Sequence, residues 1–165
     1  MPEPTLALSL DDLTDETSAL ERAQGKVEDL MGQPILRQSR TLTLDADGQR
    51  DLVIPAWPLH DVESVEVDGE PVEVEWSEAG WLRRADGRRW PSGPRTVEVE
   101  VDAGWDEAPK TLVDVILSVA KRGIDNPNGY QTENIAGYSY RIGGAPGAVL
   151  STQERDDVAR YAIRR

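Results

Sequence analysis

The sequence predicts an α+β fold in which helices pack beside an inserted antiparallel β region. Three observations lead to this prediction. Apolar residues recur at helical spacing near both ends of the chain, the period changes to two between residues 36 and 107, and Gly-containing turns separate the alternating runs. A chain of 165 residues can bury one self-supporting core, so we predict a single domain over residues 1–165.

The N-terminal region, residues 1–35, is predicted to be helical. Its apolar positions follow a helical period, and Gly32 supplies a helix end. We expect one amphipathic helix from about Thr17 onward, preceded by a separate short turn near Leu10 that Ser9 caps. The core side of this helix is expected to consist of Leu20, Ala23, Val27, Leu30 and Met31.

The middle region, residues 36–107, alternates apolar and polar residues with a period of two, which is typical of strands with one buried face. Turn residues separate the runs at Asp47-Gly48, Asp68-Gly69, Asp86-Gly87 and Ser92-Gly93-Pro94. We predict an antiparallel meander of five strands, over residues 41–44, 52–54, 65–67, 72–76 and 97–101.

The C-terminal half is predicted to contain two helices joined by a long loop. Residues 108–123 form a core helix that begins near Pro109 and ends at Gly123. Residues 124–150 are rich in Gly and Pro and show no sustained period, which is typical of a functional or disordered loop, and we expect an interface loop here. Residues 151–165 form a last helix, because Ser151-Thr152-Gln153-Glu154 matches a capping box.

Composition narrows the function classes. The net charge of −13 disfavours binding to phosphate backbones and to anionic membranes. With no cysteine and a single histidine, His60, the chain lacks a disulfide framework, a thiolate nucleophile and the usual zinc ligands. We therefore expect no enzymatic activity, no metal and no cofactor. No apolar run approaches the roughly 20 residues of a membrane span, and the basic start of a signal peptide is absent, so we expect synthesis in the cytoplasm.

The strongest local pattern is the alternation of valine with acidic residues on three predicted strands. It predicts that one sheet face carries Glu66, Asp68, Glu73, Glu75, Glu98, Glu100 and Asp102. Like charges opposite one another destabilise a sheet, so the presence of this pattern requires an explanation. Two interpretations stay open: the face serves solubility, or it must stay near DNA without binding it.

Aromatic and basic residues gather toward the end of the chain. The tail from Arg160 to Arg165 carries three arginines in an acidic protein, which either complement the dipole of a last helical turn or dock on an acidic partner. Tyrosines in the Gly-rich loop pose the same question. The candidate interface residues are Tyr130, Tyr138, Tyr140, Arg141, Arg160, Tyr161, Arg164 and Arg165.

Short motifs follow one another in a defined order along the chain. They are Gln33-Pro34-Ile35-Leu36, Pro55-Ala56-Trp57-Pro58-Leu59 before Val62-Glu63-Ser64-Val65, Ala103-Gly104-Trp105 before Ala108-Pro109, Glu133-Asn134-Ile135-Ala136-Gly137-Tyr138-Ser139-Tyr140, and Leu150-Ser151-Thr152-Gln153-Glu154. This order resembles that of the head-to-tail adaptor proteins, also called head completion or connector proteins, of long-tailed bacteriophages. The resemblance covers nearly the whole chain.

The resemblance implies a structural virion protein at the head–tail interface, assembled in the host cytoplasm. Such proteins form a ring, commonly of twelve copies, beneath the portal protein; the ring extends the DNA channel toward a stopper or tail-terminator protein. It implies that DNA passes through without specific binding, because a carboxylate wall offers no phosphate-neutralising contacts. On this interpretation the channel is lined by Glu66, Glu73, Glu75, Glu98 and Glu100.

Two other function classes remain as alternatives. One is a carbohydrate-binding or carbohydrate-active β module of a phage tail, which would use a cleft lined by tryptophans; the chain has five. The other is a small acidic regulator that imitates DNA and competes with it for a basic partner. The helices predicted at both ends of the chain argue against a tail β module.

Overall fold

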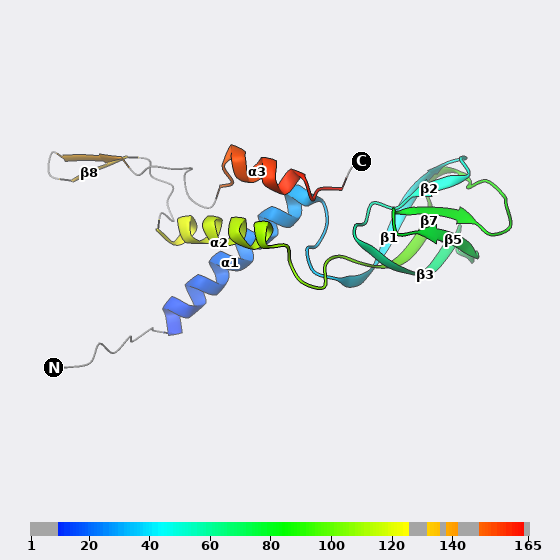
Figure 1. Ribbon diagram of the computed structural model, residues 1–165, viewed down its shortest axis with the longest axis horizontal. Helices are drawn as coiled ribbons and strands as arrows, with labels where there is room; N and C mark the ends of the chain where they lie inside the picture. Colours follow the sequence, from blue (N-terminus) through cyan, green and yellow to red (C-terminus); the bar gives the residue numbers. More distant parts are fainter. Residues whose placement is uncertain (1–9, 126–131, 136–137, 142–148, 164–165) are drawn as a thin grey trace. The chain divides into compact units, whose positions relative to one another are not determined.

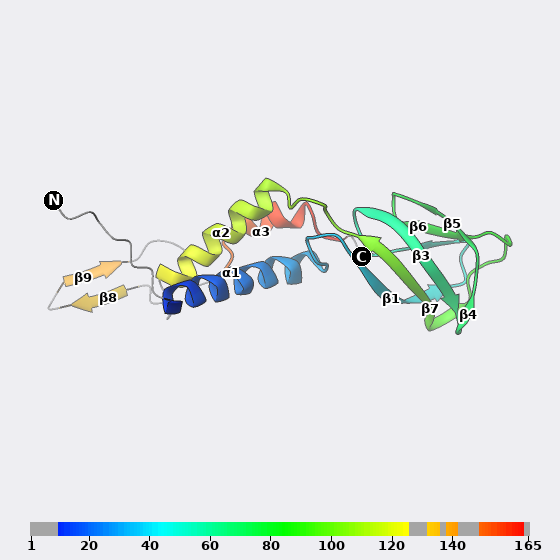
Figure 2. The same ribbon diagram turned by 90° about the horizontal axis from the view of Figure 1, so that it is seen from below.

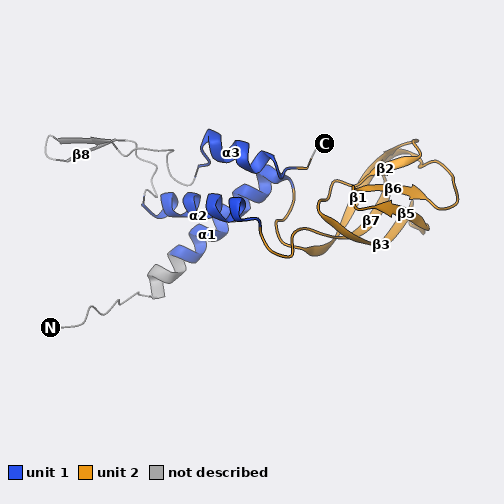
Figure 3. Cartoon of the chain, in the orientation of Figure 1, with its two compact units in different colours: residues 1–32, 109–162 blue, residues 33–108, 163–165 orange. Residues whose placement is uncertain are grey.

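The computed structural model describes residues 10–125, 132–135, 138–141 and 149–163, with side chains for residues 16–125 and 149–163. Helices and antiparallel strands occur together in this part of the chain, which confirms the predicted α+β class (Figures 1 and 2). The chain divides into two compact units (Figure 3). The helical unit holds residues 1–32 and 109–162, and the β unit holds residues 33–108 and 163–165.

The described helices of this unit are α1 (Leu10–Met31), α2 (Lys110–Asp125) and α3 (Thr152–Ala159). Its core is formed by Ala19, Ala23, Val27, Met31, Leu112, Val115, Val119, Ala120 and Val158. On α1 the buried residues recur at every fourth position, so they form a stripe along one side. Leu20 and Leu30, which the sequence predicts in this core, are instead 39% and 40% exposed, because they lie on the flanks of that stripe.

Helix α1 is longer than the sequence predicts. A turn near Leu10 and a separate helix from Thr17 are expected, but α1 is continuous over 22 residues. Neither Gly nor Pro lies between these two positions, so nothing there removes a helical hydrogen bond or requires another backbone conformation. The predicted cap, Ser9, lies outside the described residues. Helix α2 likewise continues through Gly123 to Asp125.

Helix α3 begins with the capping box that the sequence predicts. The Ser151 hydroxyl accepts a hydrogen bond from the Glu154 backbone N–H at 3.3 Å, and the Glu154 carboxylate accepts one from the Ser151 N–H at 2.7 Å. The helix ends at Ala159 with Arg160 as its C-cap, so the prediction that it extends to residue 165 is wrong for residues 160–163. Arg160 and Tyr161 follow the helix rather than form its last turn.

Two antiparallel sheets form the β unit. One has the strand order β1-β7-β3-β4, with β1 at Gln38–Asp47, β3 at Leu59–Val67, β4 at Glu70–Pro71 and β7 at Ser92–Ala103. The other has the order β2-β6-β5, with β2 at Asp51–Val53, β5 at Val74–Ser77 and β6 at Trp81–Arg84. The predicted meander is therefore wrong in its connectivity, since β7 lies between β1 and β3 (Figure 2).

The side chains of β7 suit its central position. Val97, Val99 and Val101 of this strand have no exposed surface. The β2-β6-β5 sheet packs on this apolar face, while β1 and β3 pair with the two edges of β7 and add their own side chains to the same layer. Strand β6 is absent from the sequence prediction, because Arg83 and Arg84 are consecutive polar residues that break the period of two.

The apolar faces of the two sheets share one core. It contains Ala46, Leu52, Ile54, Ala56, Leu59, Val65, Leu82, Trp90, Val97, Val99, Val101 and Ala103. Since successive residues of a strand point to opposite sides, the residues between these valines and leucines lie on the outside of the unit. The alternating pattern in the sequence therefore predicts correctly which side of the long strands β1, β3 and β7 is buried.

The chain enters and leaves the β unit side by side. The Arg37 N–H donates to the Trp105 carbonyl oxygen, and the Trp105 N–H donates to the Ile35 carbonyl oxygen, both at 2.9 Å. Gly104, beside this contact, has a φ of +115°, and a Cβ atom there would lie 2.6 Å from the Leu36 carbonyl oxygen. Only glycine satisfies both the backbone angle and the close approach.

Part of the predicted loop over residues 124–150 has regular structure. Strands β8 (Thr132–Ile135) and β9 (Tyr138–Arg141) pair antiparallel, so the expectation of an irregular loop is wrong for these eight residues. Strands of four residues are too short to establish a period in the sequence. Within the described part of the chain, no helix has the length and apolar character needed to cross a membrane.

We predict opposite effects of alanine at Gly104 and at Gly25. Gly104→Ala forces a clash with the backbone of residue 36 and should lower the free energy of unfolding by about 1–3 kcal/mol. Gly25→Ala places a methyl group in open space within α1 and should raise it by about 0.5–1 kcal/mol. All five tryptophans lie in the β unit, so fluorescence in a urea titration reports that unit and far-UV circular dichroism reports the helices. A Gly104→Ala variant with the parent fluorescence midpoint would contradict the prediction.

Candidate interaction surfaces

The outer face of the β1-β7-β3-β4 sheet carries unpaired acidic charge. Glu66 on β3 lies directly opposite Glu98 on β7, and both side chains are exposed. Glu100 lies opposite Ser64, whose hydroxyl donates to the Glu100 carboxylate at 3.2 Å. Two carboxylates at neighbouring strand positions repel each other and reduce the stability of the sheet. We call Glu66, Glu98 and Glu100 the acidic face.

The predicted single face of seven carboxylates is divided between two sheets. Glu75 lies on β5, in the other sheet, where its partner in register is Arg83 of β6. Arg83 also forms a two-point ion pair with Asp51, at 2.8 and 3.0 Å. Glu73 precedes β5 and belongs to the same side of the β unit. The sheets pack through their apolar faces, so their outer faces point away from each other, and Glu73 and Glu75 do not extend the acidic face.

Asp102, which continues the alternation on β7, is neutralised. Arg37 donates to both of its carboxylate oxygens, and a further Arg37 N–H donates to Asp106 at 3.1 Å. The hydrogen bond from Arg37 is the main cause that lowers the pKa of Asp102. His60 lies nearby, with its Nε2 atom 2.8 Å from the Gly104 carbonyl oxygen, so this nitrogen is the donor and the ring has a structural contact.

The five tryptophans are distributed over the β unit. Trp90 is buried in the core, and Trp76 packs against that core from its edge. Trp81 lies 5.5 Å beneath an arginine guanidinium, while Trp57 and Trp105 form an edge-to-face pair with ring centres 5.3 Å apart. Among the described residues, Trp57 and Trp105 are the two tryptophan rings in contact, so the five rings do not form one stacked row.

Gln33 is a buried polar residue that holds the backbone of Trp57 in place, a role that the sequence does not indicate. Its side-chain oxygen accepts a hydrogen bond from the Trp57 N–H at 3.0 Å and another from Arg40 at 3.3 Å, while its amide N–H donates to the Trp57 carbonyl oxygen. These contacts fix the backbone of Trp57, whose side chain is 48% exposed. A rigid, exposed tryptophan is typical of interface hot spots. A lone glutamine has no period in the sequence that could reveal this role.

The predicted interface residues of the C-terminal half lie in several places. Arg160 is exposed and pairs with Asp157 at 3.6 Å, and Tyr161 is half-buried, with its backbone N–H bonded to the Val158 carbonyl oxygen. Tyr138, Tyr140 and Arg141 belong to β9, in register with Ile135, Glu133 and Thr132. Tyr130, Arg164 and Arg165 lie outside the described residues.

An ion pair joins α3 to α2 within the helical unit. The Arg122 guanidinium donates to both oxygens of the Glu154 carboxylate, at 3.0 and 2.7 Å, and to the Val149 carbonyl oxygen at 3.1 Å. Burial alone would raise the pKa of Glu154, but the hydrogen bonds from Arg122 and Ser151 outweigh it and leave the pKa below its usual value. Glu154 therefore links the start of α3 to α2.

Among the described residues, no group of three or more His, Asp or Glu side chains is arranged to hold a metal ion. The features of the described chain are instead surfaces: the acidic face, an exposed tryptophan at residue 57 and the end of α3. Surfaces of this kind are suited to contacts with other macromolecules.

Comparison with solved structures shows where this fold occurs. The whole chain superimposes on 85% of a chain from the neck of an empty GTA particle computed with C6 symmetry, at 20% identity and a TM-score of 0.59. It superimposes equally on 93% of a chain from the neck of a native GTA particle computed with C12 symmetry, at 18% identity and a TM-score of 0.59.

A chain from the virion of a native gene transfer agent particle gives a TM-score of 0.60 at 18% identity, with all of this chain matched to 84% of that one. At these identities the likeness establishes a shared fold. No protein-family model matches the sequence, and no curated protein matches it.

We predict that the Arg122–Glu154 pair contributes stability that is lost in acid. Because the pKa of Glu154 is lowered in the folded state, its contribution is complete above the unfolded pKa of about 4.3 and declines as the pH falls through the folded pKa. Helix unfolding followed by circular dichroism should therefore show a smaller drop in melting temperature below about pH 4.3 for Glu154→Gln than for the parent.

The matched control is Asp156→Asn, which removes an exposed carboxylate from the same helix outside this network. This variant should keep the acid dependence of the parent. Identical acid dependence for the parent and Glu154→Gln would show that the ion pair does not couple to folding.

Proposed function

We propose that the chain is a structural, non-enzymatic virion protein: a head-to-tail adaptor that forms a ring beneath the portal, extends the DNA channel and joins capsid to tail. The observation that carries the proposal is the match of the complete chain to chains from particle necks, one computed with C12 symmetry and one with C6. The order of motifs in the sequence supports the same role independently of the structure.

A ring imposes a geometric requirement on each subunit. A cyclic assembly joins copies head to tail, so every copy needs two different surfaces that complement each other. Different surfaces on two units meet that requirement more readily than one face does. The partners of the ring would be further copies of this chain, about twelve as in the resembling family, with the portal on one side and a stopper or tail-terminator protein on the other.

The acidic face is assigned to the channel wall. Glu66 and Glu98 oppose each other, and no side chain among the described residues forms an ion pair with either; their repulsion lowers stability, which favours a functional reason for keeping them. In a ring each carboxylate is repeated around the channel, and DNA passing through finds no phosphate-neutralising contact and releases no counterions. DNA therefore moves past the wall without specific binding.

The end of the chain is assigned to contacts with the portal or a neighbouring copy. Arg160 is exposed and Tyr161 half-buried at the end of α3, and arginine and tyrosine are enriched among interface hot spots. Tyr138, Tyr140 and Arg141 on β9 are assigned to the same kind of contact. The location of the protein would be the head–tail junction of the virion, after assembly in the host cytoplasm, with no role for a membrane.

We predict that positive charge on the acidic face slows DNA exit. Glu98→Lys with Glu100→Lys replaces repulsion by phosphate pairing, so DNA ejection from assembled particles should be slower than in the parent, and the delay should shrink as salt rises. Both positions are exposed, so folding should survive. Ejection is followed by the fluorescence of a DNA-binding dye outside the particle.

The control for this experiment is the pair Glu73→Lys and Glu75→Lys. It makes the same change of charge on the outer side of the other sheet and should leave ejection at the parent rate. Equal delays of DNA ejection from both pairs would contradict the assignment of the channel wall to the β1-β7-β3-β4 sheet.

We also predict that removing residues 160–165 separates folding from assembly. These residues follow the last turn of α3, so the midpoint of thermal unfolding should change little. Head–tail joining, scored by electron microscopy of lysates that carry the truncated protein, should fail. An Arg160→Gln variant, which keeps the rest of the tail, should join partially. If the truncated protein unfolds instead, the segment belongs to the core and its assignment to an interface is wrong.

A further inference from the structure

Helix α2 has two apolar sides. Its core side is buried against the other helices, as expected for an amphipathic helix. A second stripe consists of Val113, Leu117 and Ile124, which are 38%, 52% and 45% exposed. The spacing of four and seven residues places them on one side of the helix. Helices that are apolar on two sides are usually covered on both, so this second stripe requires a partner.

The second stripe borders a groove between α1 and α2. This α1–α2 groove has a volume of about 310 Å³ and is lined by Glu16, Leu20, Leu117, Ala120, Lys121, Ile124 and Asp125. Leu20 adds an exposed apolar side chain from α1 to those of α2. Two carboxylates and one ammonium group surround the apolar floor, so the rim is negative.

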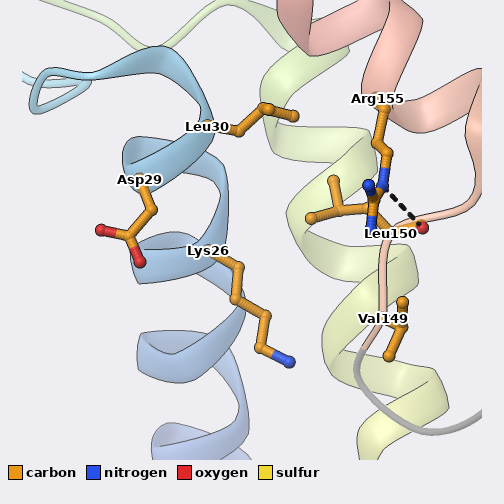
Figure 4. Close-up of a pocket in the computed structure, with 6 residues that line it drawn as sticks. All are labelled: Lys26, Asp29, Leu30, Val149, Leu150 and Arg155. Atoms are coloured by element: carbon orange, nitrogen blue, oxygen red, sulfur yellow. Dashed lines mark hydrogen bonds between the residues drawn. The ribbon is translucent and has the colours of Figure 1, made fainter.

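A second groove lies between α1 and the start of α3. This α1–α3 groove has a volume of about 350 Å³ and is lined by Lys26, Asp29, Leu30, Val149, Leu150 and Arg155 (Figure 4). Leu30 and Val149 are each 40% exposed. Two cations and one carboxylate surround its apolar residues, so this rim is positive, the reverse of the first groove.

The two grooves open on different sides of the helical unit. The buried stripe of α1 follows Ala19, Ala23, Val27 and Met31. With 3.6 residues per turn, Leu20 lies on one flank of that stripe and Leu30 on the opposite flank. Leu20 borders the negative groove and Leu30 the positive one. One helical unit therefore presents two different apolar surfaces with opposite rim charge, which is the arrangement a head-to-tail contact needs.

We propose that the α1–α2 groove of one copy of this chain binds the α1–α3 surface of the next copy, with Leu30 and Val149 seated against Leu117 and Ile124. This inference rests on the proposed ring and names the surfaces that close it. A second copy is the occupant because the two surfaces complement each other in charge. Copies that each carry a net charge of −13 repel one another overall, so a contact between them needs local pairs of opposite sign to set its register.

Engineered cysteines test the contact directly, because the chain has no cysteine of its own. A protein carrying both Leu30→Cys and Leu117→Cys should form a ladder of disulfide-linked oligomers under mild oxidation, read on a non-reducing gel. A mixture of the two single variants should give the mixed dimer as its main product. Val53→Cys, at a residue that is 67% exposed in the β unit, is the control for random collision.

Charge exchange gives a second readout. Lys26→Glu with Arg155→Glu reverses the positive rim and should lower the rate of ladder formation by about twofold to fivefold for each pair lost. Adding Glu16→Lys and Asp125→Lys should restore it. Arg88→Glu with Arg89→Glu makes the same change of charge on the β unit. It should slow ladder formation no more than a general increase in negative charge does.

The outcomes separate this contact from the proposed ring. If a variant with one cysteine forms disulfide-linked dimers by itself, the same surface of two copies is in contact. Such a symmetric contact would overturn the inference. A disulfide within one chain, between Leu117→Cys and Leu6→Cys, would show that the N-terminal segment covers the groove and would overturn it as well. If the parent forms rings by electron microscopy with isolated portal and no ladder appears, only the contact is wrong. If neither rings nor ladder form, the proposed function fails too.

Discussion

Strand β7 is the constraint on which the β unit depends. It pairs with β1 along one edge and with β3 along the other, and its three buried valines form the centre of the core. Its intervening residues, Glu98 and Glu100, are thereby fixed on the outside of the same sheet. One alternating sequence thus forms both the core and the acidic face. A shift of the strand register by one residue would exchange the two faces.

The helical unit depends on a different kind of contact. Its packed stripes are made of small and branched side chains, and the short α3 is attached through Val158 and the Arg122–Glu154 pair. The glutamate that caps α3, Glu154, also accepts both hydrogen bonds from Arg122 of α2. One side chain therefore both starts the helix and attaches it to α2. An eight-residue helix has little stability of its own, which explains why it requires this anchor.

The surfaces that remain exposed carry the functional argument. The sheet exposes carboxylates, and the helical unit exposes leucine, isoleucine and valine at two grooves. A charged face next to DNA resists binding, whereas an apolar groove promotes contact between proteins. An adaptor ring needs both properties in separate places: weak interaction with the passing DNA and firm interaction between neighbouring copies. We propose that the two units of this chain supply them separately.

The sequence by itself determined the α+β class, the buried side of each long strand and the capping box of α3. These features depend on neighbours within a few residues, so local periodicity and the side chains of Ser151 and Glu154 suffice to define them. Only the tertiary structure decided that β7 lies between β1 and β3, that Glu75 faces Arg83 rather than Glu98, and that Leu20 and Leu30 are exposed. Strand order and the division of exposed side chains between surfaces are set by contacts between residues far apart in the chain, and alternation alone carries no information about which strand becomes the neighbour of which.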